Sequence, residues 1–360
     1  MPTLGPAVRK RVNETSSGNQ RPAPEKAARC ALGPFVYAPP ANRVASMILV
    51  CGEALVDLFV SPDPESGVRT ETVLGGSPFN VAIGLSRLGA SARFFGGVSK
   101  DAFGQAIVAK LKRERVDLSV IKLSDRLSTI SVVSTDEHGQ PTYAFHGDGK
   151  ADRDMTPADL PELDGRIDAI TVGSYAIAVP PVGDALLALV RREAGRTTIS
   201  LDPNVRPTVT PDMQAWRKRF EAFLPCAAIV KASEEDLRIG YGDTHSIGEL
   251  VDRWHRAGPS LVVVTRGENG ASAFLRGHGP ISVPGRPVKV VDTVGAGDTF
   301  HAALLAFLSR IDRLAVQRLE DITMKEVEDA LRYAVAASAI TCMRKGADLP
   351  TDSEVRDYRA

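Results

Sequence analysis

The chain has 360 residues, of which 43% are apolar and 24% are charged, and its 44 basic side chains balance 44 acidic ones. This composition is typical of soluble globular proteins, and the length suits one large α/β domain or two smaller ones. Because the net charge is zero, we expect no sequence-independent attraction to nucleic acid or to an anionic membrane surface. A small neutral or weakly anionic ligand is therefore the expected partner.

Several other classes of protein are excluded by simple features. The longest apolar runs, such as Ala302 to Leu308, fall far short of the roughly 18 residues that a membrane-spanning helix needs. The four cysteines are scattered and no Cys-x-x-Cys occurs, so the sequence supports neither a zinc site nor a disulfide framework. We therefore expect the protein to work in a reducing cytoplasm.

Residues 1–46 differ from the rest of the chain. They contain seven prolines and seven basic residues, their only acidic residues are Glu14 and Glu25, and they show no sustained hydrophobic periodicity. Such a segment cannot bury enough apolar surface to fold, so we expect a disordered or loosely attached tail. Its poverty in acidic residues resembles a transit peptide, but the abrupt start of an apolar run at Met47 equally suggests a non-native or mis-assigned start.

From Met47 onward, short apolar runs alternate with stretches of helical periodicity. The expected strands span 47–51, 92–98, 169–172, 198–202, 228–231 and 261–265. The expected helices span 80–88, 103–114, 182–193, 214–224, 247–256, 299–310 and 324–342. This alternation predicts an α/β protein with a doubly wound, mostly parallel sheet that is covered by helices on both faces. The domain is expected over 47–350, with 351–360 as a C-terminal extension.

Two regions break this alternation. Residues 68–74, 129–135 and 142–145 have the period-two pattern of strands, and the residues from His138 to Pro141 have the composition of a turn. We expect lid strands within about 58–74 and 127–147 to form a small antiparallel sheet that projects from the main one. Such an appendage usually covers a ligand or forms an interface.

The strongest chemical signal lies between residues 288 and 305. An apolar run that we expect to be a strand ends at Asp292, a Gly295-Ala296-Gly297 turn follows, and Asp298 stands at the start of a long apolar helix. Converging backbone N–H groups and the positive end of the helix dipole suit this turn to an anion. Asp298 could accept the proton of an attacking hydroxyl or could only cap the helix, and the residues alone leave the two roles about even. The Gly-Lys-Ser/Thr ending of a P-loop is missing.

A second motif, Gly75-Gly76-Ser77-Pro78-Phe79-Asn80, precedes an expected helix. Paired glycines permit close approach of the backbone to a ligand, and Asn80 offers both a donor and an acceptor, as a polyhydroxylated sugar requires. Taken alone, the motif is more simply a turn with Asn80 as the helix cap. Asp57 follows the first strand, at the sheet edge where ligands bind, although an isolated Asp there is more often part of a solvated loop.

Together these motifs resemble the PfkB (ribokinase-like) carbohydrate kinases over residues 47 to about 350. Asp292 to Leu305 fit the C-terminal signature of that family throughout, and Gly75 to Gly89 resemble its N-terminal signature. Segments that begin at Gly52, Asp202 and Lys231 are most similar to the fructokinase branch. One departure from that branch is Gly147, which stands where an arginine is common.

The resemblance implies roles for individual residues. Asp298 would be the catalytic base, and the anion hole would consist of Gly295, Ala296 and Gly297. The sugar would be bound by Asp57, Gly75, Gly76, Asn80 and Arg206. The nucleotide, ATP, would be bound by Thr265, Arg266, Gly267, Gly270 and Lys231.

The resemblance also implies metal ions. The segment from Lys231 to Asp236 is similar to the family's magnesium-associated Asn-x-x-Glu motif, with Ser in place of Asn and Asp in place of Glu. Asp236 and Glu235 would then hold Mg²⁺, directly or through water, although from the residues alone this stretch is only an acidic helix start. Some relatives further imply a monovalent cation, K⁺, near Asp292.

The sequence therefore predicts an ATP-dependent, Mg²⁺-requiring kinase that phosphorylates a primary hydroxyl of a small sugar, with fructose as the leading substrate. One alternative is a 2-keto-3-deoxygluconate kinase on the same fold, in which Arg206 or Arg153 pairs with a substrate carboxylate. Others are a nucleoside kinase and a catalytically silent member that binds a partner. No nucleic acid or membrane partner is expected. One face of the lid would cover the sugar and the other would meet a second copy, which gives a homodimer.

Overall fold

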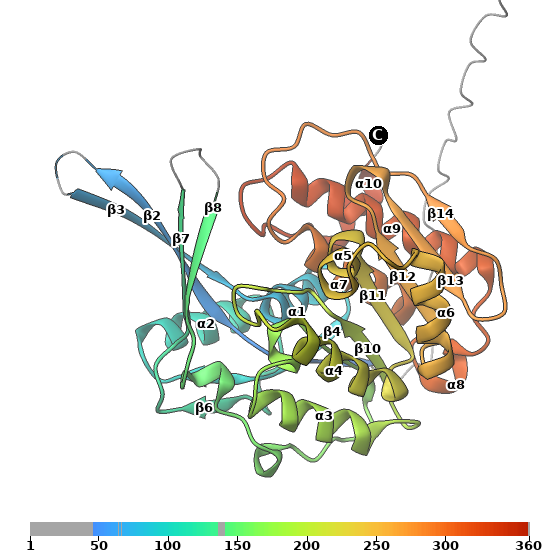
Figure 1. Cartoon of the computed structure of the whole chain (residues 1–360), viewed down its shortest axis with the longest axis horizontal. Helices are drawn as coiled ribbons and strands as arrows, with labels where there is room; N and C mark the ends of the chain where they lie inside the picture. The colour runs from blue at the N-terminus through green and yellow to red at the C-terminus, as the bar shows by residue number, and fades with distance from the viewer. Residues whose placement is uncertain (1–45, 64, 66, 136–140, 359–360) are drawn as a thin grey trace, which may run out of the picture. The chain divides into compact units, whose positions relative to one another are not determined.

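The computed structural model describes residues 46–63, 65, 67–135 and 141–358 (Figure 1). The predicted tail at 1–46 lies outside the described residues except for its last position, and so does most of the turn predicted at 138–141. Both therefore stay predictions. No helix in the described part of the chain is long and apolar enough to cross a membrane.

An eight-stranded sheet forms the centre of the domain, in the order β14-β13-β12-β11-β10-β9-β1-β4. Its strands are β1 (Met47–Cys51), β4 (Ser91–Phe95), β9 (Ile167–Gly173), β10 (Thr198–Asp202), β11 (Ile229–Ser233), β12 (Leu261–Thr265), β13 (Ala271–Leu275) and β14 (Ile281–Val283). The pairs from β4 to β12 are parallel, whereas β13 and β14 are antiparallel additions at one edge. The run predicted at 92–98 divides into β4 and the short β5 (Gly97–Ser99), which pairs with β6 (Lys122–Ser124).

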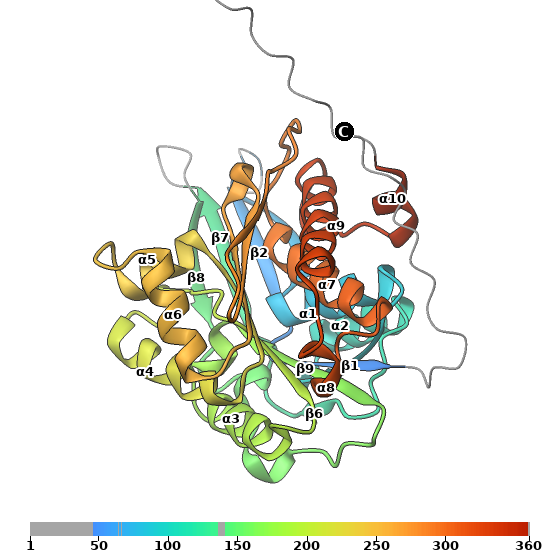
Figure 2. The same cartoon turned by 90° about the vertical axis from the view of Figure 1, so that its right-hand side faces the viewer.

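Helices cover both faces of this sheet (Figure 2). One face carries α1 (Ser77–Arg87), α2 (Ala102–Arg113), α7 (Ala296–Arg310) and α9 (Met324–Cys342). The other carries α3 (Val182–Glu193), α4 (Met213–Phe223), α5 (Glu234–Tyr241) and α6 (Ile247–Ala257). Two short helices complete the set, α8 (Val316–Leu319) and α10 (Asp352–Asp357). Burial on both faces explains the continuous apolar runs of the central strands, and the predicted doubly wound α/β fold is confirmed.

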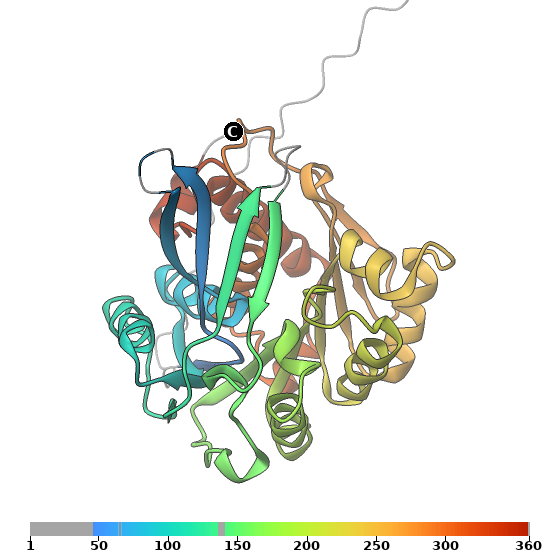
Figure 3. The same ribbon diagram turned by 60° about the vertical axis from the view of Figure 1, so that its left-hand side comes forward.

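The predicted lid is a separate four-stranded sheet that projects from the large one (Figure 3). Its order is β3-β2-β7-β8, with bounds β2 (Leu55–Asp63), β3 (Gly67–Gly75), β7 (Ile130–Thr135) and β8 (Pro141–His146). The outer pairs are antiparallel as expected, but the central pair of β2 and β7 is parallel. These two strands are joined by a long crossover through α1 and α2 and not by a hairpin, and a crossover permits parallel pairing.

The strand predicted to end at Asp292 is wrong. The preceding strand β14 ends at Val283, and residues 284–295 form a loop in which Pro284 and Pro287 cannot donate to a sheet ladder. The predicted C-terminal extension contains α10, which is anchored to the domain because the hydroxyl of Tyr333 donates to Asp352 Oδ1 at 2.6 Å.

Candidate active site

Asp298 lies in the first turn of α7 and faces α1. The helix begins at Ala296, and its N-cap is Gly295 in the left-handed conformation, with φ at 77°, so Asp298 is not the cap. A Cβ at Gly295 would lie 2.6 Å from the Cβ of Ala347, so both conformation and space require glycine there. The carboxylate of Asp298 is buried.

The residues around Gly76 bring α1 to this carboxylate. Gly76 is the N-cap of α1 with φ at 109°, and a Cβ there would lie 2.9 Å from the backbone oxygen of Glu53. The helix therefore starts at Ser77, three residues before the predicted start, and Asn80 is not a cap. Instead Ser77 Oγ donates to Asp298 Oδ1 at 2.7 Å and Asn80 Nδ2 donates to Oδ2 at 2.8 Å. The two predicted signatures thus meet through their polar side chains.

Lys231, on β11, lies beneath the glycine turn. Its Nζ donates to Asp202 Oδ2 at 2.9 Å, and a Cβ at Gly297 would lie 3.3 Å from the same Nζ. Burial disfavours the charged form of Lys231, but attraction to Asp202 and Asp236 outweighs burial and raises its pKa. The ammonium is therefore charged and buried under the place where we predicted an anion.

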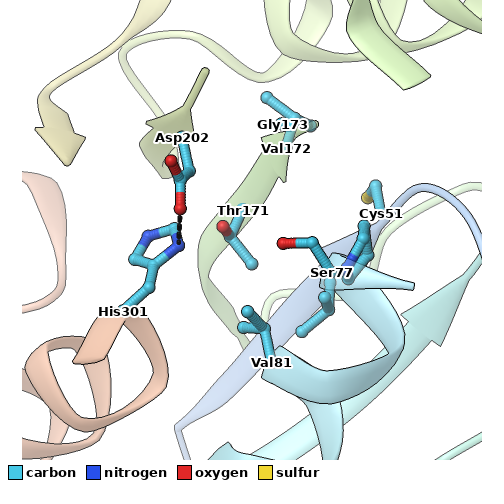
Figure 4. Close-up of a pocket in the computed structure, with 10 residues that line it drawn as sticks. Cys51, Ser77, Val81, Thr171, Val172, Gly173, Asp202 and His301 are labelled. Atoms are coloured by element: carbon cyan, nitrogen blue, oxygen red, sulfur yellow. Dashed lines mark ion pairs between the residues drawn. The ribbon is translucent and has the colours of Figure 1, made fainter. Parts of the chain in front are cut away.

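A small pocket separates Asp202 from α1 (Figure 4). Its polar lining includes Ser77, Thr171, Asp202 and His301, which come from α1, β9, β10 and α7. Burial raises the pKa of Asp202 to about 6, although the Lys231 charge opposes the rise. Burial and the same Lys231 charge lower the pKa of His301 to about 3, so its imidazole is neutral. Its Nε2 shares a 2.8 Å hydrogen bond with Ser200 Oγ, and its Nδ1 lies 3.6 Å from Asp202 Oδ2 (Figure 4). The partner that balances Asp202 is therefore Lys231.

A second group of polar side chains lies at the base of the lid, near the starts of β2 and β7. Burial raises the pKa of Asp57, while the hydrogen bond from Ser131 and the charge of Arg206 oppose that rise. Gly75 is required beside this carboxylate, since a Cβ there would lie 2.5 Å from Asp57 Oδ2. The structure thus brings together four of the residues predicted to bind sugar: Asp57, Gly75, Gly76 and Arg206.

Two carboxyl groups next to these residues were not predicted from the sequence. Glu53 is fully buried with its Oε2 unpartnered among the described residues, and burial raises its pKa to about 8 against a hydrogen bond from Ser174. Asp152 is also buried, where it accepts hydrogen bonds from Thr129 and, at 2.7 Å, from the hydroxyl of Tyr175. Ser174 has φ at 54°, an unusual conformation for a residue other than glycine. Nothing in the local sequence identifies these positions, because their partners come from distant segments.

All the residues predicted to bind nucleotide except Lys231 lie at the turn between β12 and β13. Thr265 ends β12, and Arg266 N donates to the oxygen of Gly270 at 2.8 Å. Gly270 has φ at 86°, and a Cβ there would lie 2.1 Å from the backbone oxygen of Val283. Gly267 also has a positive φ, of 52°. Thr265 pairs with Ser233 on β11, so this turn lies two residues beyond Lys231 along the same edge of the sheet.

The predicted magnesium segment has a clear structural role. Asp236 closes a capping box at the start of α5, with its Oδ2 accepting from Ser233 N at 2.8 Å and from Ser233 Oγ at 2.6 Å. Its Oδ1 accepts from Val205 N at 2.7 Å, whereas Glu235 is exposed. In the described ranges, no three His, Cys, Asp or Glu side chains form a cluster that could hold a metal ion.

Asp292 connects the glycine turn to the segment that follows α9. Its Oδ1 accepts from Val294 N at 3.0 Å and its Oδ2 from Gly346 N at 2.8 Å. The neighbouring Lys345 reaches the lid, where its Nζ lies 2.9 Å from both carboxylate oxygens of Glu71 on β3. The segment that follows α9 therefore contacts both the turn and the lid.

Residues 45–354 match the model of the pfkB family carbohydrate kinases. The chain belongs to this family. As a carbohydrate kinase it is 40% identical over 273 residues to the fructokinase of Rhizobium leguminosarum bv. trifolii, covering 76% of this chain and 82% of that one. It is 38% identical to the fructokinase of Klebsiella pneumoniae, covering 73% and 84% of the two chains.

Solved structures are similar to this sugar kinase over most of its length. A fructokinase from Vibrio cholerae O395, crystallised with fructose, ADP and calcium ion, has a TM-score of 0.74 and 30% identity, covering 86% of this chain and 98% of that one. An aminoimidazole riboside kinase from Salmonella enterica has a TM-score of 0.71 and 26% identity, with the same coverages of 86% and 98%. These similarities confirm the predicted fold and a sugar kinase of the fructokinase-like branch.

Proposed function

We propose that this carbohydrate kinase transfers the γ-phosphoryl group of ATP to a primary hydroxyl of fructose, with Asp298 as general base. The observation that carries the proposal is the position of Asp298: its carboxylate lies in the first turn of α7, immediately after a glycine turn suited to an anion. It is held from both sides by Ser77 and Asn80. The fructokinases among its relatives support the choice of substrate.

In this proposal the chain's own residues divide the work. Asp298 removes the proton of the attacking hydroxyl, and the backbone N–H groups of Gly295, Ala296 and Gly297 stabilise the charge on the transferring group. Lys231 adds a fixed positive charge beneath the turn, with no reorganisation needed during the reaction. Asp57, Gly75, Gly76, Asn80 and Arg206 orient the sugar, and the turn from Thr265 to Gly270 holds the nucleotide. Lid strands exclude water.

The carboxylates proposed to bind metal ions already accept hydrogen bonds within the protein, and this limits how they can hold an ion. Both carboxylate oxygens of Asp236 already accept hydrogen bonds, so Asp236 and Glu235 suit a Mg²⁺ ion that is held mainly by nucleotide phosphates and water. When bound, Mg²⁺ neutralises charge on the β- and γ-phosphates. A K⁺ ion is proposed beside Asp292, whose oxygens already order the segment at Gly346.

The polar groups around Asp57 suit the hydroxyls of a neutral sugar. Carboxyl groups of Asp57, Asp152 and Glu53 gather there, against the guanidinium groups of Arg153 and Arg206. Together these carboxyl and guanidinium groups can accept from and donate to sugar hydroxyls, and Glu53, whose pKa of about 8 keeps it protonated at neutral pH, adds an O–H donor.

A coupled assay of ADP release tests the proposal. Fructose, 2-keto-3-deoxygluconate, ribose and adenosine are each offered with ATP and Mg²⁺, and we expect kcat/KM to be highest for fructose. A higher value for the keto acid would favour the rival substrate. Absence of ADP release with all four would indicate a catalytically silent protein.

A further inference from the structure

Gly147, just after lid strand β8, leaves space that an arginine from elsewhere fills. A Cβ at this position would lie 2.3 Å from Nη2, 2.8 Å from Cζ and 3.0 Å from Nε of Arg153. Gly147 does not have a positive φ, so its backbone conformation does not require glycine. A side chain at this position would instead displace the guanidinium group that packs directly against it.

The guanidinium group of Arg153 is buried but incompletely paired. The residue is 8% exposed, and its Cζ lies 5.5 Å from the centre of the Tyr175 ring. Nη1 donates to Asp148 Oδ1 at 2.6 Å, yet the Asp148 side chain is fully exposed and such a pair adds little stability. Nε is buried and has no hydrogen-bond partner among the described residues. A buried N–H group without an acceptor is costly unless a ligand supplies one.

The surroundings connect Arg153 to the sugar-binding group. Tyr175 packs edge-on against Phe145 of the lid, with ring centres 5.7 Å apart. Phe145 is in register with Ser131, and Ser131 is in register with Asp57, so these three side chains share one face of the lid. Arg153 therefore lies at the end of the face that carries Asp57.

We propose that Arg153 recognises the sugar: its guanidinium group donates hydrogen bonds to hydroxyl oxygens of the substrate beneath the lid. Gly147 provides the space that this guanidinium needs. The inference rests on the proposed function and extends it by a specificity-determining residue. A polyhydroxylated, uncharged sugar suits the position because Asp152, next in the chain, is buried beside Tyr175 and offers acceptors where Arg153 offers donors.

The first test replaces the guanidinium and keeps the apolar stem. We expect Arg153→Met to raise the KM for fructose about 10- to 100-fold, the loss typical of a hydrogen bond to a charged group, and to leave the KM for ATP within about two-fold. Arg153→Lys should be intermediate, because an ammonium keeps the charge but lacks the planar fork. The matched control is Arg126→Met, since Arg126 pairs with Asp154 near the same loop but is half exposed. A folded Arg153→Met enzyme with a wild-type KM for the sugar would overturn the inference.

A second test uses Gly147. We expect Gly147→Ala to displace the guanidinium and raise the KM for fructose, but to add little in the Arg153→Met background, because the group that it displaces is then missing. Equal effects of Gly147→Ala in both backgrounds would contradict the proposed pairing.

Binding is also measured without turnover, as the rise in Tm that fructose causes in the ATP-free protein. We expect that rise to be smaller for Arg153→Met than for wild type or Arg126→Met. If the wild type uses another of the four candidate substrates, the proposed substrate is wrong, and the same variants are compared with the substrate that is used. The proposed role of Arg153 is then rejected only if Arg153→Met leaves the KM for that substrate unchanged. Absence of both turnover and ligand-induced stabilisation in the wild type would reject both proposals.

Discussion

Asn80 Nδ2 donates to Asp298 Oδ2 at 2.8 Å, across 218 positions of sequence. The contact requires α1 and α7 to pack closely, and Gly84 permits this, since a Cβ there would lie 2.8 Å from the Cβ of Ala302. With Ser77 on its other oxygen, the Asp298 carboxylate is fixed in one orientation. If Asp298 is the base, as we propose, its orientation before the sugar arrives keeps the entropy lost in the reaction small.

Asp298→Asn should separate catalysis from binding. The amide has nearly the same shape but cannot accept the hydroxyl proton, so we expect kcat to fall by about 10² to 10⁴ or more. Sugar and ATP affinities, measured by calorimetry, should stay largely intact. A kcat close to that of the wild type would show that Asp298 has only a structural role.

Lys231→Met should destabilise the fold more than Lys231→Met combined with Asp202→Asn. The single change leaves the buried Asp202 carboxylate without its 2.9 Å partner, which costs about 3–5 kcal/mol for a typical buried pair. The double change removes both charges, so the double variant should have a higher free energy of unfolding than the Lys231→Met variant. Urea denaturation of both variants provides the measurement, and a double variant no more stable than the single one would contradict the pairing.

Glu53→Gln should change how stability depends on pH. The pKa of Glu53 is raised from 4.5 to about 8 in the folded protein, so the folded state holds this proton more tightly than the unfolded state. The contribution of Glu53 to stability is therefore full below about pH 4.5 and is lost as the pH rises toward 8, with a slope of up to about 1.4 kcal/mol per pH unit. Glutamine cannot titrate, so the Tm difference between variant and wild type should move in favour of the variant from pH 5 to pH 8. A constant difference would reject the protonated carboxyl.

The lid should support a homodimer. Val132 is in register with Leu58, which places both on the face opposite to Asp57, and an isologous contact would bury this face in two copies at once. Light scattering should give a mass near twice 38.4 kDa, and Val132→Asp should reduce it to one copy. Leu123→Asp is the control, because Leu123 is 53% exposed but lies outside the lid sheet. A wild-type mass of one copy would exclude a stable dimer.

Removal of residues 1–45 should leave the kinase intact. The family match begins at residue 45, and the preceding residues have no apolar periodicity that could add to a core. We expect kcat and Tm to equal those of the full chain. A large fall in either would mean that the segment docks on the domain.

The positions of the central strands and of most long helices along the chain were predictable. Strands that are buried on both faces are continuous apolar runs, and such runs are easy to recognise in a sequence. The edge strands β13 and β14 were not predictable, since runs such as Ala271-Ser-Ala have small side chains with weak strand preference. The strand expected before Asp292 was wrong for a related reason. Exposed valines there, Val290 and Val291, have the composition of a strand but lie in a loop.

The candidate site was predictable where a motif is continuous in the chain, as around Asp298 and Gly76. It was not predictable where partners come from separate elements. The pairing of Lys231 with Asp202 depends on neighbouring strands, and the contact of Gly147 with Arg153 depends on how a loop turns back under the lid. A local sequence pattern does not show which residues of separate elements lie close together in space.

The contacts of Asp292 with Gly346 and of Gly295 with Ala347 also bear on how the enzyme matures during synthesis. All strands of the large sheet have emerged from the ribosome by Val283, but the wall against which the glycine turn rests is made only some sixty residues later. A chain truncated before Gly346 should therefore lack the support of the glycine turn although it contains every strand of the large sheet.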